Sequence, residues 1–301
     1  MTSADRASLH EYLAEQVQAI DHVLDFWVPD EGVDPVSIHT AMRYSLFAGG
    51  KRIRPILAIA SARAISADSG NGVEHAAAAL ELVHTYSLIH DDLPALDNDD
   101  LRRGRPTCHK VFGEAMAILA GDALLTLAFE VLSRIKQVDA ERKIRLVEEL
   151  SRAAGTVGGM IGGQVNDLEG ERKTPTPVLL ESIHRAKTGA LLRASVRVGA
   201  IYAGAIDFEL TALSQYGEHV GLAFQIVDDL LDVEEPSQAL GKTAGKDEAQ
   251  QKITFPAVYG LERSREMAEE ERLQAHLAVQ TFGDRAERLR QIADFVVQRK
   301  A

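Results

Sequence analysis

The sequence predicts an all-α protein, a bundle of about ten helices or more, on three observations. Apolar residues recur at steps of three and four along most of the chain, which places them on one face of a helix. No segment alternates apolar and polar residues between turn residues, so strands should be few or absent. Short breaks separate the periodic segments, several of which are apolar on more than one face, as in a large bundle. We therefore expect residues 1–301 to form a single domain.

The expected helices of the first half are marked by periodicity and composition. Residues 9–24 and 38–46 carry apolar side chains at helical spacing. Residues 74–92 are rich in alanine, the residue with the strongest helix propensity. A double glycine at 49–50 precedes a further helix that begins near Pro55.

The second half continues the pattern. Residues 177–204 open on a proline and end on a glycine, as a helix often does. Further helices are expected over residues 208–232, 262–277 and 284–300. Breaks are expected at residues 49–50, 70–72, 93–106, 158–163, 174–177 and 236–245.

Composition excludes several classes of protein. The 301 residues are 46% hydrophobic and 26% charged, with a formal net charge of −12 that argues against a general nucleic-acid binder. Anionic substrates remain compatible where local cations reverse the sign. The single Cys108 cannot form an internal disulfide, the start lacks a signal-peptide pattern, and the longest apolar stretch is interrupted by Glu114 and Asp122. We expect a cytoplasmic protein with no membrane span.

Negative charge is concentrated in residues 91–100, where five of ten positions are aspartate. Carboxylates this close repel one another and must be solvated, paired or bound to a cation. Pro94 disfavours helical geometry at the residue before it, so Asp97 can fold back toward Asp91 and Asp92. A solvated acidic loop is the alternative. A calcium loop is excluded because the ligand spacing fails after Asp99.

A second acidic cluster lies on an otherwise apolar helix and comprises Asp228, Asp229 and Asp232. Asp228 and Asp232 are four residues apart and share a face, about 6 Å apart along the axis. Charged residues in such a helix are rarely buried unless paired or bound to metal. Two clusters of this kind predict facing carboxylates across a cavity. Their oxygen ligands suit Mg²⁺, which bridges protein carboxylates to the phosphates of a substrate.

Positively charged residues are concentrated at two places in the sequence. Lys51, Arg52 and Arg54 follow the double glycine, where backbone N–H groups at a helix start can bind an anion. Arg102 and Arg103 follow the first acidic cluster and can clamp a phosphate bidentately. His84 precedes Asp91 by two helical turns near the same face, although a structural core histidine is an equal alternative. No serine or cysteine is paired with a histidine as a nucleophile.

Six segments in order, "GGKRIRP", "HTYSLIHDDLPALDNDDLRRGRPT", "GQVNDLEGE", "KTGALL", "FQIVDDLLD" and "GKTAGKD", resemble the trans-isoprenyl diphosphate synthases. Within that family the chain is most similar to the short-chain farnesyl diphosphate synthases of bacteria. The resemblance implies a helical bundle around a deep central cavity, usually a homodimer. It also implies condensation of an allylic diphosphate with isopentenyl diphosphate.

The resemblance assigns roles to individual residues. It implies that Asp91 and Asp97 hold two Mg²⁺ ions and Asp228 a third, with support from Asp92 and Asp232. The residues implied to bind substrate are Gly50, Lys51, Arg54, His84 and Arg103 for isopentenyl diphosphate, and Arg102, Lys187, Gln225, Lys242 and, less directly, Lys252 for the allylic diphosphate. Those implied to act in catalysis are Lys187, Thr188, Gln225 and Arg102, with Gln164 and Asp167 beside the allylic site.

Product length is expected to depend on Tyr86 and Ser87. Tyr86 lies five residues before Asp91, about 7.5 Å along a regular helix, where an aromatic ring can form the floor of the cavity. The resemblance associates an aromatic residue at this position with farnesyl diphosphate, made from dimethylallyl and geranyl diphosphate. Ordinary core packing of Tyr86 is the alternative.

Three other functions remain open at this point. A geranylgeranyl diphosphate synthase differs only in the length of the product. A class I terpene cyclase is disfavoured because it would replace the second aspartate cluster and would not need "GGKRIRP". An inactive regulatory subunit is disfavoured because both aspartate clusters are intact.

Overall fold

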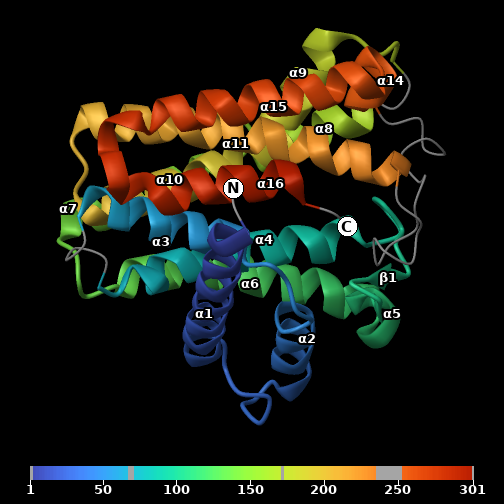
Figure 1. Ribbon diagram of the computed structural model, residues 1–301. Coiled ribbons are helices and arrows are strands. Elements are labelled where there is room, and N and C mark those ends of the chain that lie inside the picture. The colour runs from blue at the N-terminus through green and yellow to red at the C-terminus, as the bar shows by residue number, and fades with distance from the viewer. Residues whose placement is uncertain (1–2, 67–70, 171–172, 235–252, 300–301) are drawn as a thin grey trace.

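The computed structural model describes residues 3–66, 71–170, 173–234 and 253–299, and it is helical nearly throughout (Figure 1). In chain order the helices are α1 (Ser3–Trp27), α2 (Val36–Leu46), α3 (Ile53–Ile65), α4 (Val73–Asp91), α5 (Cys108–Phe112), α6 (Glu114–Arg134), α7 (Ala140–Ala154), α8 (Met160–Gly170), α9 (Pro177–His184), a π-helical turn (Arg185–Gly189), α10 (Ala190–Ala203), α11 (Asp207–Glu234), α14 (Phe255–Tyr259), α15 (Leu261–Ala278), a 3-10 helix (Gln280–Ala286) and α16 (Glu287–Gln298). The only strands in the described residues are β1 (Leu101–Arg102) and β2 (Arg105–Pro106), an antiparallel pair. The all-α prediction is confirmed.

The long helices pack in pairs that are distant in sequence. α4 packs on α6 and α3, α3 on α10, α10 on α11, and α11 on α15. α1 and α2 project from one side of this bundle (Figure 1). The C-terminal ends of α4 and α11 point to the same end of the molecule, on the right in Figure 1, where β1, α8 and α14 also lie. That end therefore brings the two aspartate clusters together.

Small residues allow the central helices to approach closely. Ala76, Ala77, Ala78 and Ala79 of α4 have no exposed surface, so this helix is surrounded on several faces. A Cβ atom on Gly199 of α10 would lie 1.9 Å from the carbonyl oxygen of a residue of α3. The backbones of α3 and α10 are thus in direct contact, which a larger side chain would prevent.

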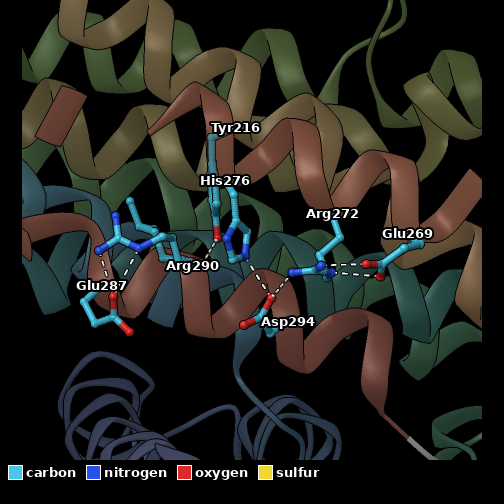
Figure 2. A network of polar contacts seen from close by, with 8 residues as sticks. Tyr216, Glu269, Arg272, His276, Glu287, Arg290 and Asp294 are labelled. Carbon is cyan, nitrogen blue, oxygen red and sulfur yellow. Dashed lines mark hydrogen bonds and ion pairs between the residues drawn. The ribbon is translucent and has the colours of Figure 1, made fainter. Parts of the chain in front are cut away.

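The last helices are tied to α11 by a polar network (Figure 2). The Asp294 carboxylate of α16 lies 2.7 Å from Nη1 of Arg272 and 2.8 Å from Nε2 of His276, both on α15. The buried hydroxyl of Tyr216 on α11 donates to the carbonyl oxygen of Leu289 on α16 at 2.6 Å. These contacts join α15 and α16 to the helix that carries the second aspartate cluster.

The basic run after the double glycine is divided by the fold. Arg52, predicted to help bind an anion, turns into the protein and is only 3% exposed. Its guanidinium lies 2.7 Å from Glu81 of α4 and 2.9 Å from Asp21 of α1, and it donates to the Leu46 carbonyl oxygen. Arg52 therefore anchors the loop that carries Gly50 and leaves anion binding to its neighbours.

Three expected boundaries differ from the structure. α8 begins at Met160, inside the break expected at 158–163, because Gly163 is helical and packs against another backbone. The helix expected over residues 177–204 contains the π-helical turn. The last helix begins at residue 287 rather than 284, after the 3-10 helix.

One helix of the described part, α6, is long and apolar enough to cross a membrane by length and composition alone. A core helix of a soluble protein satisfies the same criterion. Here Leu124, Ala128 and Val131 of α6 are completely buried in the bundle.

Replacing Arg52 by methionine should lower the free energy of unfolding by about 3–5 kcal/mol, because it leaves the Glu81 carboxylate buried and unpaired. The double variant Arg52→Met/Glu81→Met should recover much of that loss. Urea unfolding at neutral pH measures both changes. A double variant no more stable than the single one would show that the uncompensated charge is not the cause.

Candidate active site

A cavity of about 650 Å³ is lined by residues from the C-terminal parts of α4 and α11. Both aspartate clusters contribute to its wall, Asp91 and Asp97 from one side and Asp228 from α11. The other predicted residues that line it are Arg54, His84, Tyr86, Ser87, Arg102, Arg103, Gln164, Asp167, Lys187, Thr188 and Gln225. Gly50 and Lys51 lie beside it on the loop before α3, and Lys242 and Lys252 lie outside the described residues.

The first aspartate cluster folds back on itself as the sequence predicts. α4 ends at Asp91, and the backbone N–H of Asp97 donates to the Asp91 carbonyl oxygen at 2.8 Å. Burial raises the pKa of Asp91 to about 6, and the Asp97 carboxylate adds to this effect while the Lys187 ammonium opposes it. Asp91 is therefore a carboxyl group whose charge the protein alone compensates poorly.

Arg102 is positioned by the same loop. Its guanidinium pairs with the buried carboxylate of Asp92 and lies 3.3 Å from Asp99. Arg102 thus lines the cavity, but two carboxylates already hold its side chain. Asp92, predicted to support a metal, is neutralised here by an arginine.

The three aspartates of the second cluster have different surroundings. The Asp229 carboxylate accepts from the Phe255 backbone N–H at 2.9 Å and from Gln225 Nε2 at 2.8 Å. Asp228 faces the cavity and lies 3.2 Å from Nη2 of Arg299. Asp232, predicted to support a metal, is buried and does not line the cavity.

A cluster of cationic side chains lies on the other side of the cavity. Arg54 is half-buried, its buried Nε atom has no hydrogen-bond partner in the described part of the chain, and burial lowers the pKa of its guanidinium to about 10. Burial and the neighbouring arginines, first Arg54 and then Arg103, hold the pKa of His84 well below its usual range. The imidazole is therefore neutral among guanidinium groups. Such an uncompensated cluster favours an anionic ligand.

Gly50 and Lys51 border this cationic cluster. A Cβ atom on Gly50 would lie 2.7 Å from Nη1 of Arg103, so the guanidinium crosses the loop directly over the glycine and a larger residue would displace it. Burial and the Arg299 charge lower the pKa of Lys51, while the Asp228 carboxylate raises it. Lys51 therefore lies within electrostatic reach of the second aspartate cluster.

The π-helical turn brings Lys187 and Thr188 into the cavity. Lys187 Nζ lies 2.6 Å from Asp167 of α8, and the Thr188 hydroxyl donates to Gln225 Oε1 at 2.8 Å. Gly163 of α8 makes this possible, since a Cβ atom there would lie 2.1 Å from the Lys187 backbone nitrogen. The extra residue of a π turn shifts the helix face, a feature often found at functional sites.

Two residues of the site were missed by sequence reasoning. The Arg299 guanidinium lies 3.9 Å from the centroid of the Phe224 ring and contacts Asp228. His184 stacks on Phe255 with ring centroids 5.3 Å apart, and burial lowers its pKa to about 4. A lone arginine after the last helix resembles any surface residue, so no sequence signal marks it.

The oxygen ligands fit a Mg²⁺ site that a substrate completes. Among the described residues, no three histidine, cysteine, aspartate or glutamate side chains are grouped closely enough to hold a metal ion by themselves. Mg²⁺ is commonly bound through one or two carboxylates plus substrate phosphates and water. Asp91 and Asp97 on one wall and Asp228 on another meet that description.

In the metal-free protein, Asp91→Asn should stabilise the fold more at neutral than at acid pH. The folded pKa of Asp91, about 6, exceeds its ordinary value of 3.8. The destabilisation by its buried charge is thus absent below pH 3.8 and complete above pH 6. We expect the advantage of the variant in free energy of unfolding to grow by about 2 kcal/mol between about pH 4.5 and pH 8.

Urea unfolding with a chelator present measures this difference. The histidines titrate in both proteins, so their contributions cancel when the two free energies are subtracted. An advantage that is the same at both pH values would mean that Asp91 titrates normally in the folded protein.

Comparison with known proteins agrees with this geometry. Residues 35–295 match the model of the polyprenyl synthetase family. The farnesyl diphosphate synthase of Geobacillus stearothermophilus is 49% identical over 262 residues, which are 86% of this chain and 87% of that protein. Geranylgeranyl pyrophosphate synthase 12 of Arabidopsis thaliana is 49% identical over 269 residues, 88% of this chain and 74% of that protein.

Solved structures show the same architecture. Geranylgeranyl pyrophosphate synthetase from Pyrococcus horikoshii has a TM-score of 0.87 at 31% identity, covering 98% of this chain and 100% of that chain. An FPP/GFPP synthase from Zymomonas mobilis has a TM-score of 0.85 at 36% identity, covering 97% and 99%. Because the family model matches most of this chain, the chain belongs to the polyprenyl synthetase family, the trans-isoprenyl diphosphate synthases, and is a prenyltransferase.

Proposed function

We propose that the protein makes farnesyl diphosphate from isopentenyl diphosphate and the allylic primers dimethylallyl and geranyl diphosphate. The names of its relatives divide between farnesyl and geranylgeranyl products, so the proposal depends on this cavity. The observation that carries it is Tyr86, whose ring lines the cavity and is 5% exposed. A bulky, enclosed ring about 7.5 Å along α4 from Asp91 limits the chain that can grow below the diphosphate site.

We propose that Mg²⁺ is the cofactor, with Asp91 and Asp97 holding two ions and Asp228 a third. When bound, the ions supply positive charge that offsets the diphosphate and the charge that develops on the leaving group. Asp228 must exchange its contact with Arg299 for the ion. The chain's own cations then complete the charge balance on the allylic side.

The cationic cluster of Arg54, Arg103 and the neutral His84 supports binding of the isopentenyl diphosphate. Diphosphate carries about three negative charges and would pair with the guanidinium groups of Arg54 and Arg103, which line the cavity. The loop residues Gly50 and Lys51 would close this site from the side of α3. This half of the cavity would orient the double bond of isopentenyl diphosphate toward the allylic carbon.

Residues of the π-helical turn support the allylic side. The allylic C–O bond breaks and its electron pair leaves with the diphosphate. The isopentenyl double bond then attacks the allylic cation, a C–C bond forms, and loss of a proton restores a double bond. The Thr188 hydroxyl donates a hydrogen bond to Gln225 Oε1, so the lone pairs of the hydroxyl oxygen can face the cation. These fixed dipoles need no reorganisation during the reaction. The resemblance to the family implies that the departed diphosphate accepts the proton that is lost.

We also propose that the protein is a homodimer. α6 supports this, because it presents exposed apolar side chains beside its buried face, with Ile118 at 44% and Leu119 at 51% exposure. A second copy would cover such a surface. Sedimentation equilibrium of the purified protein measures the mass. We propose a cytoplasmic location from the single Cys108, which cell fractionation can test.

The purified protein should convert isopentenyl and dimethylallyl diphosphate mainly to a C15 diphosphate, and only with Mg²⁺. Chromatography of the dephosphorylated products, with and without a chelator, measures this. A longer Mg²⁺-dependent product would retain the prenyltransferase and replace farnesyl by geranylgeranyl diphosphate. Absence of condensation with dimethylallyl or geranyl diphosphate would contradict the proposed reaction.

Tyr86→Ala should shift the main product from C15 to C20 or longer, because the ring that limits the cavity is removed. Steric exclusion of this kind is worth about a factor of ten or more in product ratio. Tyr86→Phe is the matched control and should keep the C15 product, since the hydroxyl has no hydrogen-bond partner among the described residues. An active Tyr86→Ala variant with unchanged products would rule out Tyr86 as the floor.

A further inference from the structure

The ring of Tyr86 rests against a histidine that the mechanism does not use. His90 lies one turn further along α4 and also lines the cavity. The two rings meet edge to face, with centroids 5.7 Å apart and planes inclined at 80°. This is a favourable arrangement of aromatic rings, worth about 1 kcal/mol. His90 therefore helps to fix the orientation of the Tyr86 side chain.

His90 is in turn held by α6. Its Nε2 atom lies 3.0 Å from the carbonyl oxygen of Ile118, an acceptor only, so the Nε2–H group donates the hydrogen bond. The Asp122 carboxylate lies 3.9 Å from the same nitrogen. The imidazole thus bridges α4 and α6, with one edge on Tyr86 and its Nε2 atom on a backbone carbonyl.

Gly121 provides the space for this bridge. A Cβ atom on Gly121 would lie 2.2 Å from Nε2 and 2.5 Å from Cδ2 of His90, well inside van der Waals contact. Glycine inside a helix is less stable than alanine by about 1 kcal/mol. The backbone of Gly121 is helical and does not need glycine for its conformation. Among the described residues, the three atoms nearest to such a Cβ all belong to the His90 imidazole, so the imidazole is the reason that glycine is required here.

We propose that His90 and Gly121 set the depth of the cavity, and so the product length, through Tyr86. His90 is a positioning residue that holds the ring across the cavity floor, and Gly121 lets the imidazole reach α6. The inference rests on the proposed function, in which Tyr86 limits chain growth. It adds two residues, on two helices, that determine where that limit lies.

The two residues should act in opposite directions when replaced. His90→Ala removes the edge contact and the bridge to α6, so the Tyr86 ring can turn aside and the product should lengthen. Gly121→Ala keeps the imidazole but pushes it away from α6. The imidazole and the Tyr86 ring both border the cavity, so the displaced imidazole moves toward the cavity and the product should shorten.

The experiment compares the product ratios of the wild type, His90→Ala, Gly121→Ala and the double variant, with dimethylallyl and isopentenyl diphosphate as substrates. We expect His90→Ala to raise the C20:C15 ratio, and Gly121→Ala to raise the C10:C15 ratio, each by about tenfold. In the double variant the added methyl group has no imidazole to displace. Its products should therefore match those of His90→Ala, a strongly non-additive result.

Asp122→Asn is the matched control on α6, because it leaves the imidazole and its hydrogen bond to Ile118 in place, and its product ratio should equal that of the wild type. Should Gly121→Ala alone fail to fold, recovery of folding in the double variant would report the same clash, and failure to recover would count against it. Thermal unfolding of each variant reports folding independently of products.

The outcomes separate this inference from the proposed function. A wild type that makes mainly C20 would correct the proposed product, yet opposite, non-additive shifts around C20 would still support the roles of His90 and Gly121. Suppose instead that the wild type makes C15 and Tyr86→Ala lengthens the product, but His90→Ala and Gly121→Ala leave it unchanged. That result would keep the proposed function and reject only the roles of His90 and Gly121. Additive shifts in the same direction would also reject those roles.

Discussion

The burial of several carboxylates around one poorly solvated cavity is the constraint to which the rest of the site responds. Several acidic groups near the cavity are each matched by a specific cation or N–H group. Asp92 is paired with Arg102, Asp167 with Lys187, and Asp228 with Arg299. Asp229 takes a backbone N–H group instead. Asp91 has no comparable neutralisation, and its raised pKa marks the place where a cation from outside the protein stabilises most.

The cationic side of the cavity shows the opposite imbalance. The guanidinium groups of Arg54 and Arg103 both line the cavity and have lowered pKa values, and the imidazole of His84 remains neutral beside them. One end of the bundle thus exposes a carboxylate that favours metal ions and a guanidinium cluster that favours an anion. A diphosphate bound through metal ions to one side and a second diphosphate on the other would satisfy both. Both sides of the cavity must be held in place by the surrounding helices. The ion pairs of Arg52 and the network around Asp294 contribute to this.

Much of this could be predicted from the sequence, because the information is local. Apolar periodicity located many of the helices. The two aspartate clusters, separated by more than a hundred residues, were predicted to face one cavity because each lies near the end of an apolar helix. The remainder depends on contacts that have no local signature. The inward turn of Arg52 needs Glu81 and Asp21 as partners, and the contact of Arg299 with Asp228 spans 71 residues. The π-helical turn arises inside a segment with an uninterrupted helical pattern.

Glycine explains why the break expected at residues 158–163 differs from the structure, and why part of the cavity's shape has no signature in the sequence. Glycine in a sequence indicates a break, and this is correct at Gly50, where φ is positive. Gly163, Gly199 and Gly121, however, lie inside helices, and each is a place where a methyl group would collide with a neighbour. They admit the Lys187 backbone, the backbone of α3 and the imidazole of His90. The shape of this cavity is therefore determined partly by side chains that are absent, and their effect appears only when the packed neighbours are known.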